Sequence, residues 1–275
     1  MKKTTKKLLP VRTTPLNLDF SENEIQRYSR QILLDEVGGV GQAKLRAARV
    51  LIVGAGGIGS PVLLYLAGAG IGTLGIADDD SVELSNLHRQ IAHATNRLGQ
   101  PKTTSAATAA AALNPLVRVN QHQLRLTAAN ASKLLAEYDI ICDGTDNAAT
   151  RYLLADACYL AGKTLVSAAA IRFEAQLATF RPGTPCYRCL YPHPAPADLA
   201  PSCAQAGVLG AITGVIGALA ATEVIKQVLQ LGDTTAGKLL LWDALGARFH
   251  TVKLTRDPAC TLCGDTPSIR DLSGH

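Results

Sequence analysis

The stretch that decides the fold runs from residue 50 to residue 59 and has the sequence VLIVGAGGIG. Four apolar residues with the character of a buried strand lead into a turn that contains Gly54, Gly56, Gly57 and Gly59. A glycine-rich turn between a strand and a helix lets a phosphate approach the backbone N–H groups at the helix N-terminus. No Lys-Ser or Lys-Thr pair follows the glycines, so the P-loop signature is absent. The segment predicts a nucleotide-binding unit of the Rossmann type.

The next expected strand, Thr73 to Ala77, is followed directly by an acidic residue, Asp78. A carboxylate about twenty residues after the glycine turn is where a Rossmann-type domain binds the ribose hydroxyls of its nucleotide. The two strands and the helix between them form one βαβ unit, and its ligand is expected at the carboxyl ends of the strands. The alternative is that Asp78 is a surface acid in the triple-aspartate turn at residues 78–80.

A polar and basic run follows that an ordinary dinucleotide site does not need. It consists of Ser85, Asn86, Leu87, His88, Arg89 and Gln90, and Lys102 lies shortly beyond it. Arginine and lysine can supply fixed positive charge to phosphates. An arginine and an asparagine just past the ribose-binding acid suit a triphosphate whose α-phosphate is under attack. Taken singly, Arg89 and Lys102 could equally be solvated surface charges.

Asp146 follows another expected strand, Asp139 to Asp143, in a Thr-Asp-Asn turn. Because the carboxyl ends of parallel strands meet at one edge of a sheet, Asp146 is expected on the same edge as Asp78. A carboxylate in this place can hold Mg²⁺. The alternative is that Asp146 caps the helix expected from Asn147 to Ala161, and the two roles are compatible.

Four of the seven cysteines form two Cys-x-x-Cys pairs, Cys186 with Cys189 and Cys260 with Cys263. Four thiolates suit tetrahedral Zn²⁺, and a site filled by four protein ligands is structural rather than catalytic. The pairs are farther apart than in an ordinary zinc ribbon, so the fold has to bring them together. The alternatives are two independent surface pairs or a disulfide. An odd number of cysteines without an export signal argues for reduced thiols.

Cys203 follows a segment rich in proline and alanine and immediately precedes an expected helix. A helix N-terminus lowers the pKa of a thiol, so Cys203 is a candidate nucleophile; an inert lone cysteine is the alternative. Cys142 and Cys158 fall in an expected strand and an expected helix, where they should be part of the core. The six histidines show no metal-ligand spacing, and none is assigned chemistry.

The rest of the chain is consistent with one continuous α/β domain. Strands alternate with helices through residue 168, which predicts a Rossmann-like parallel half. Segments 175–180, 238–242 and 248–254 predict strands that continue the sheet in antiparallel fashion. We therefore expect a mixed sheet in a single domain over residues 21–275, after a flexible basic extension over residues 1–20. A capping box formed by Ser21 and Glu24 should begin the first helix.

The composition argues against nucleic-acid binding and against a membrane span. Of the 275 residues, 47% are hydrophobic and the formal charge is +5. Five of the lysines and arginines lie in the first twelve residues, so the folded body is close to neutral, and no basic, aromatic-rich surface suggests nucleic acid. The apolar stretch at 204–222 borders on spanning length, but its many small residues favour a helix buried against the sheet rather than a membrane span. No apolar segment follows the basic start, so we expect a cytoplasmic protein.

Seven motifs occur in a characteristic order. They are RYSRQ at 27–31, GAGGIG at 54–59, SNLHRQ at 85–90, GQPK at 99–102, TDN at 145–147, CYRC at 186–189 and CTLC at 260–263. In this combination the chain resembles the ubiquitin-activating-enzyme-like adenylyltransferases of the ThiF–MoeB–HesA family over about residues 21–264. The resemblance therefore covers nearly the whole expected domain.

The resemblance implies a reaction and its participants. A small ubiquitin-like sulfur-carrier protein ending in Gly-Gly offers its C-terminal carboxylate to the α-phosphate of MgATP, and the products are a carrier acyl-adenylate and pyrophosphate. Carried over motif by motif, the roles are an approach to the nucleotide by Gly57, ribose binding by Asp78, phosphate contacts by Ser85 to Arg89 and by Lys102, and metal and nucleotide binding by Asp146 and Asn147. Arg30 would reach into the site of a partner subunit, so the resemblance also implies a homodimer.

Within this family we favour the molybdopterin-synthase branch, because residues 185–190 resemble it and no rhodanese domain follows in the sequence. The thiazole-biosynthesis branch shares nearly every motif, including a cysteine at the position of Cys203. Two other classes stay open. A nicotinamide oxidoreductase would have no reason for Arg89, Lys102 or the cysteine pairs, and a non-catalytic subunit would be expected to lack Arg30, Lys102 or Asp146.

Overall fold

The computed structural model describes residues 16–194 and 206–275. The helices are α1 (Glu22–Ile32), α2 (Gly38–Ala47), α3 (Gly59–Ala69), α4 (Lys102–Leu113), α5 (Ala128–Ala136), α6 (Ala148–Leu160), α7 (Tyr187–Leu190) and α9 (Gly210–Leu229). The strands are β1 (Arg49–Val53), β2 (Thr73–Ala77), β3 (Arg118–His122), β4 (Ile140–Asp143), β5 (Thr164–Ile171), β6 (Glu174–Phe180), β7 (Lys238–Asp243) and β8 (Arg248–Lys253).

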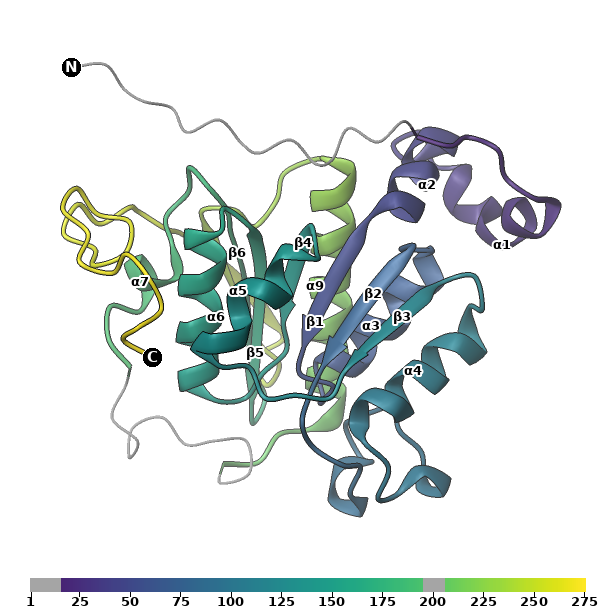
Figure 1. The fold of residues 1–275 in the computed structure, drawn as a ribbon, viewed down its shortest axis with the longest axis horizontal. Coiled ribbons are helices and arrows are strands. Elements are labelled where there is room, and N and C mark those ends of the chain that lie inside the picture. Colours follow the sequence, from purple (N-terminus) through teal and green to yellow (C-terminus); the bar gives the residue numbers. More distant parts are fainter. Residues whose placement is uncertain (1–15, 195–205) are drawn as a thin grey trace.

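The strands form one eight-stranded sheet in the order β3-β2-β1-β4-β5-β6-β7-β8 (Figure 1). The strands from β3 to β5 are parallel, and β6, β7 and β8 continue the sheet as antiparallel neighbours. The predicted α/β class with a parallel half and an antiparallel half is therefore confirmed. Since the chain crosses from one side of β1 to the other between β3 and β4, the carboxyl ends of β1 and β4 form a topological switch point, the usual place for a ligand in such sheets.

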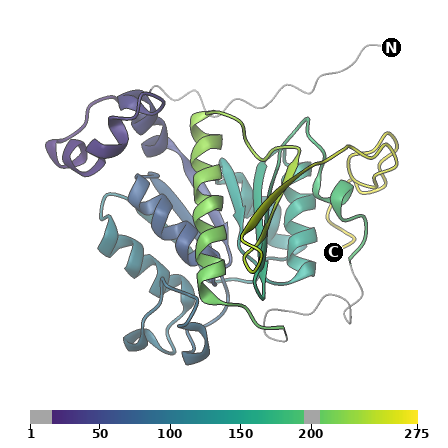
Figure 2. The same cartoon turned by 180° about the vertical axis from the view of Figure 1, so that it is seen from behind.

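The side chains of β1 point alternately to the two faces of the sheet, and this explains why helices cover both faces. Val50 and Ile52 pack into a core with α2, α3, α4 and α9, whereas Leu51 and Val53 pack into a second core with α5 and α6. Successive side chains of a strand point to opposite faces, so a continuous apolar strand needs helices on both sides. Figure 1 shows α5 and α6 on the near face, and Figure 2 shows α3 and α9 on the other.

The longest helix, α9, is long and apolar enough by length and composition alone to cross a membrane. Its inner side, including Ile212, Ile216, Ala220 and Val224, is buried in the core against the sheet. The helix begins six residues later than the apolar stretch of the sequence and continues past Glu223, which is itself buried and accepts hydrogen bonds from Gln227 and from the backbone of Thr235. Burial of a helix against the sheet, as expected from its small residues, is thus confirmed.

Local signals set most helix ends, and packing adjusts some of them. Ser21 and Glu24 form the expected capping box of α1. Pro101 is the N-cap of α4 and directly precedes its first helical residue, Lys102. Strand β5 extends three residues beyond the expected end because its alanines pair with β6 as far as Ile171 opposite Glu174. Alanine is a weak strand former, so the pairing overrides the local preference here.

Candidate nucleotide-binding site

A cavity of about 310 Å³ opens at the switch point. Its walls come from the glycine turn after β1, the acidic turn after β2, the N-terminus of α4 and the turn after β4, and Gly57, Asp78, Arg89, Lys102 and Asp146 all contribute to its surface. These residues are spread over ninety positions of the sequence, and the sheet order brings them to one edge. The volume lies at the lower end of the range of ligand pockets.

The glycines of the turn serve two different purposes. A Cβ atom on Gly59 would lie 1.8 Å from the backbone oxygen of Gly54, so Gly59 is required for close packing of α3 on the turn. A Cβ on Gly56 would meet only the Gln90 amide at 3.8 Å, because this residue faces the open cavity. Among the described residues, nothing accepts a hydrogen bond from the N–H groups of Gly56 and Gly57. Free N–H groups just before α3 are suited to phosphate oxygens.

Backbone N–H groups hold the side chain of Asp78 in the cavity wall. Its carboxylate accepts hydrogen bonds from the N–H of Ala55 at 2.7 Å and the N–H of Asp80 at 2.9 Å. Burial raises the pKa of this carboxyl, while Lys102 and the two N–H donors oppose the increase. The residue is thus a partly buried member of the site rather than a solvated surface acid.

Lys102 is buried, with 6% of its surface exposed, and its ammonium group lies 2.7 Å from the carboxylate of Asp80. Asp80 itself is largely exposed at the mouth of the cavity. A buried ammonium group needs a counter-ion, and in this structure Asp80 provides it. The sequence motif identified Lys102 but gave no indication that its charge is matched by the third aspartate of the turn.

Only the last two residues of the SNLHRQ run at 85–90 line the cavity. These are Arg89 and Gln90. Ser85 is exposed and donates to Glu83, and Asn86 is buried in a short 3₁₀ helix over Leu84–Asn86, where its side chain accepts from the N–H of Glu83. Leu87 and His88 are also absent from the described cavity wall, so phosphate contacts by residues 85–88 stay a prediction.

Gln90 was not singled out from the sequence, although it belongs to the quoted run. Its side chain is buried, and within the described residues its Oε1 atom has no hydrogen-bond partner. A buried amide oxygen without a partner is costly. Because Gln90 borders the cavity, a ligand or water in the cavity could supply the missing donor.

Asp146 and Asn147 have distinct environments. Asn147 is the N-cap of α6, and its side chain accepts from the N–H of Thr150 at 2.8 Å. The alternative role of Asp146 as a helix cap is therefore wrong, because the neighbouring asparagine occupies that position. Asp146 is exposed on the cavity wall. The turn itself is fixed by Asp143, which is buried and accepts from Thr145 and Ser167.

Arg30 lies far from this cavity within the same chain. It is exposed near the end of α1, and the neighbouring Tyr28 packs against Gly70 at the C-terminal end of α3. The cavity lies at the opposite end of α3, and a helix of this length spans about 16 Å. An arginine side chain on α1 therefore does not reach the cavity of its own chain.

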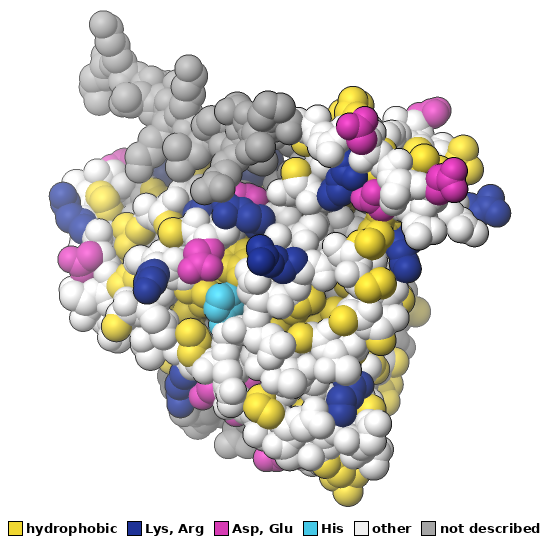
Figure 3. Space-filling view, turned by 45° about the vertical axis from the view of Figure 1, so that its right-hand side comes forward, with side chains coloured by type: hydrophobic (Ala, Val, Ile, Leu, Met, Phe, Trp, Pro, Cys, Tyr) yellow, Lys and Arg dark blue, Asp and Glu magenta, His cyan; other side chains and the backbone are white. Residues whose placement is uncertain are grey.

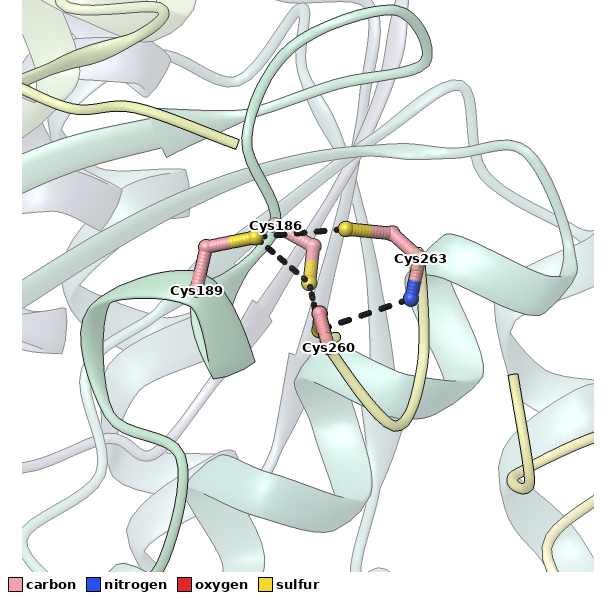
Figure 4. A group of neighbouring side chains, drawn as sticks. All are labelled: Cys186, Cys189, Cys260 and Cys263. Atoms are coloured by element: carbon pink, nitrogen blue, oxygen red, sulfur yellow. Dashed lines mark hydrogen bonds between the residues drawn. The ribbon is translucent and has the colours of Figure 1, made fainter. Parts of the chain in front are cut away.

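The two cysteine pairs come together at the C-terminal side of the molecule (Figure 4). The four sulfur atoms of Cys186, Cys189, Cys260 and Cys263 all lie within 4.8 Å of one another. Hydrogen bonds from Cys186 and the other thiols lower the pKa of the Cys263 thiol. Four close thiols fit the donor set of structural Zn²⁺. The expectation that the fold unites the pairs is confirmed.

The remaining cysteines divide into two cases. Cys142 and Cys158 are buried, as expected, and burial strongly raises the pKa of both thiols. They are therefore inert members of the core. Cys203 lies outside the described residues, and its role as a nucleophile stays a prediction.

The fold and cavity define a Rossmann-like nucleotide-binding domain with an antiparallel extension and a four-cysteine cluster. The sequence matches the ThiF family over residues 28–262, and the chain belongs to this family.

Named relatives agree with this assignment. The chain is 47% identical to the sulfur carrier protein adenylyltransferase of Thermus thermophilus, with 92% of this chain and 96% of that protein covered. It is 49% identical to the adenylyltransferase and sulfurtransferase MOCS3 of Bos taurus, with 97% of this chain and 59% of that protein covered. It is also 48% identical to the Arabidopsis thaliana protein of the same name. The chain thus spans 59% of the length of the Bos taurus protein and 54% of the length of the Arabidopsis thaliana protein.

Solved structures share the fold. The crystal structure of Escherichia coli MccB with ATP has a TM-score of 0.77 at 25% identity, with 87% of this chain and 75% of that chain covered. MccB with AMPCPP and MccA has a TM-score of 0.79, also at 25% identity, with 90% of this chain and 76% of that chain covered.

Proposed function

We propose that this protein adenylates the C-terminal glycine of a small ubiquitin-like sulfur-carrier protein. A carboxylate oxygen of the carrier attacks the α-phosphorus of ATP, the bond from that phosphorus to the bridging oxygen breaks, and pyrophosphate leaves. The carrier acyl-adenylate is the second product. The observation that carries the proposal is the meeting of free glycine-turn N–H groups, Asp78, Arg89, Lys102 and Asp146 around one cavity.

Each group has a place in the reaction. The N–H groups of Gly56 and Gly57 suit phosphate oxygens, and Asp78 suits the ribose hydroxyls. Arg89 supplies positive charge that opposes the charge developing on the α-phosphate and the departing pyrophosphate. The chain is 25% identical to MccB, which has been crystallised with ATP, and this supports ATP as the nucleotide.

Lys102 has to exchange partners when ATP binds. Its ammonium group is paired with Asp80 in this structure, and a triphosphate would compete for the same charge. The released Asp80 is exposed and can be solvated. This exchange keeps the buried charge neutralised in both states, which avoids the cost of an unpaired buried ion.

Two metal ions fit the residues present. Asp146 would hold Mg²⁺ beside the phosphates, where the ion would neutralise charge on ATP and pyrophosphate. The four cysteines would hold Zn²⁺ in a structural role. The exposed carboxylate of Asp146 and the mutual proximity of the four sulfur atoms support these assignments.

The sulfur-carrier substrate follows from the names of the relatives. The Thermus thermophilus protein, which the chain covers almost completely, is named for this substrate. We favour the molybdopterin branch and retain the thiazole branch as the alternative. A nicotinamide oxidoreductase is disfavoured, since the named relatives are adenylyltransferases.

We further propose a homodimer in which Arg30 completes the partner's site. Arg30 is too far from its own cavity, as its position at the opposite end of α3 indicates. A mostly apolar groove next to α1 includes Tyr65, Ile91, Leu113 and Ile225, and the first three are largely exposed. Figure 3, which turns the right-hand side of Figure 1 forward, shows hydrophobic side chains exposed between charged ones on that side of the molecule. Such a surface would be covered in a dimer.

Reduced cysteines also suit the expected cytoplasmic location.

The proposal is tested by ATP–pyrophosphate exchange. Purified protein with MgATP should catalyse exchange only when a carrier ending in Gly-Gly is added, and it should oxidise no NADH. The molybdopterin and thiazole carriers are compared side by side, each with a control that lacks the terminal glycine. Exchange with neither carrier would contradict the proposed reaction, whereas exchange with the thiazole carrier alone would reassign the branch.

A further inference from the structure

A buried histidine outside the predicted site lies directly beneath the glycine turn. His93 is 7% exposed, and its Nε2 atom lies 2.9 Å from the backbone oxygen of Ala55. The N–H of the same alanine donates to Asp78 at 2.7 Å. Both polar groups of Ala55 are therefore bound, one by an imidazole and the other by a carboxylate. This fixes the orientation of the residue that immediately precedes Gly56 and Gly57.

The other side of the imidazole is bound to α4. Its Nδ1 atom lies 2.9 Å from the hydroxyl of Ser105, which is fully buried one helical turn after Lys102. One imidazole ring thus connects the turn that would bind phosphates with the helix whose first residue is the buried lysine. The hydroxyl of Ser60 approaches the same Ala55 oxygen at the longer distance of 3.5 Å, so His93 provides the shorter of the two bonds.

The hydrogen-bond partners determine where the proton resides. A backbone carbonyl can only accept, so Nε2 of His93 must carry a hydrogen. Burial lowers the pKa of the imidazole, and the nearby charges of Lys102 and Arg97 add to this decrease, whereas the hydrogen bond to Ala55 opposes it. The pKa is lowered on balance, which favours the neutral ring. Nδ1 then has a lone pair and accepts from the Ser105 hydroxyl. The hydrogen bond from Nε2 to Ala55 therefore fixes the tautomer, and this tautomer leaves Nδ1 free to accept from Ser105.

We propose that His93, as a neutral imidazole protonated on Nε2, is a positioning residue that holds the glycine turn and the N-terminus of α4 in register for the phosphates of ATP. The inference rests on ATP as the ligand of the proposed function. His93 does not line the cavity, so it acts through Ala55 and Ser105. A turn whose N–H groups are oriented before binding loses less entropy when the nucleotide arrives.

Three variants separate this role from simple packing. His93→Leu removes both hydrogen bonds, His93→Gln keeps a donor that can replace Nε2, and His122→Leu is the matched control. His122 is a half-buried histidine that likewise has a hydrogen bond to a side chain, in this case Tyr138, and it does not line the cavity. Affinity for a non-hydrolysable ATP analogue is measured by equilibrium titration, with circular dichroism to verify the fold.

We expect His93→Leu to weaken binding of the analogue by roughly two- to tenfold, the effect of one neutral hydrogen bond. His93→Gln should recover part of the loss, and His122→Leu should bind like the wild type. Equal affinity of wild type and folded His93→Leu, or the same loss in both His93 variants and the control, would overturn the inference. Failure of the wild type to bind the analogue would instead contradict the proposed function.

A measurement on the unmodified protein covers the case in which His93→Leu does not fold. The ¹⁵N NMR signals of the His93 ring report which nitrogen carries the proton. We expect the neutral Nε2–H tautomer near neutral pH. A ring protonated on Nδ1 alone, or on both nitrogens, would contradict the proposed arrangement without reference to any variant.

Discussion

Two adjacent polar residues after β4 carry separate tasks. Asn147 caps α6 through its side-chain oxygen, and Asp146 leaves its carboxylate exposed on the cavity wall. A carboxylate that is not engaged in the helix cap is available for a metal ion. The two residues can therefore be tested independently, although they are neighbours in the sequence.

Asp146→Asn should abolish carrier-dependent pyrophosphate exchange without loss of stability. Asparagine has the same shape but lacks the charge that Mg²⁺ requires. The matched variant Asn147→Ala should instead lose about 1 kcal/mol in the free energy of unfolding from the missing cap. Urea unfolding and exchange at millimolar Mg²⁺ measure both effects. Near-normal exchange by Asp146→Asn would exclude it as the metal-binding residue.

Buried imidazoles should make the stability depend on pH. Burial lowers the pKa of both His93 and His122, whereas an unfolded histidine titrates near about 6.5. Below that pH the unfolded chain binds protons that the folded chain does not. The stabilisation is thus complete above about pH 6.5 and is lost as the pH falls toward the folded-state values. Around His122, the charge of Glu137 raises the pKa and partly opposes burial.

Urea unfolding at about pH 7.5 and about pH 5.5 tests whether the protein loses stability as the pH falls. The free energy of unfolding should be lower at the acidic pH, and the difference should shrink in His122→Gln, which has no titratable ring. Since His122 does not line the cavity, nucleotide binding serves as a control for the fold of the variant. An unchanged pH difference would show that this ring contributes nothing to it.

Among the elements, the short helix α7 is joined to α6 by a buried ion pair. Arg188, between the first two cysteines of the cluster, donates to Asp156 on α6 at 2.7–3.1 Å, and His275 approaches the same carboxylate at 2.8 Å. Asp156 is fully buried. The pair anchors the first cysteine pair to the body of the domain.

Asp156→Ala should lower the free energy of unfolding by about 3–5 kcal/mol, because Arg188 would be left buried without its counter-ion. The control is Asp233→Ala, which removes a fully exposed carboxylate 3.9 Å from Lys238 and should change stability little. Both are measured by urea unfolding. Equal losses in the two variants would mean that the buried Asp156–Arg188 ion pair contributes no more to the free energy of unfolding than the exposed Asp233–Lys238 pair.

The cysteine cluster should bind one Zn²⁺ per chain. Structural zinc contributes on the order of 10 kcal/mol, so Cys186→Ser or Cys260→Ser should unfold or aggregate the protein. Cys158→Ser is the control, because Cys158 is buried outside the cluster and its replacement should leave the zinc content unchanged. Elemental analysis of protein purified without chelators provides the measurement, and protein free of zinc would refute the assignment.

For the whole molecule, the separation of Arg30 from its own cavity makes subunit complementation possible. Arg30→Ala should slow adenylation by about tenfold to a hundredfold, which corresponds to loss of one charge-assisted hydrogen bond of roughly 1.5–3 kcal/mol. Asp146→Asn should be inactive. In a mixed dimer of these variants, one site combines an intact Asp146 with the partner subunit's intact Arg30.

Mixing the two variants should therefore restore part of the activity as subunits exchange. Size-exclusion chromatography with differently tagged chains verifies that mixed dimers form. If verified mixed dimers are no more active than their parents, Arg30 does not act across the interface. The parental homodimers provide the baseline at the same protein concentration.

Local sequence signals were sufficient for much of the fold. The capping box at Ser21, the glycine turn at 54–59 and the strand at 73–77 depend on interactions between residues close in the chain, and the structure has them where the sequence predicts them. The period of apolar residues likewise identified the strands, because it shows which side of an element can be buried. Asp78 and Lys102 were found as members of ordered motifs.

The tertiary structure decided which of these residues meet. Packing of the connection between β2 and α4 placed Asp80 against Lys102, left Ser85 to His88 off the described cavity wall and brought His93 beneath Ala55. The tertiary structure also brought together two cysteine pairs separated by about seventy residues and carried Arg30 to the far end of α3. No local preference contains this information, because such contacts arise only when strands from distant parts of the chain pair and their helices pack. The sequence by itself determined the elements and the chemical groups, and packing determined their partners.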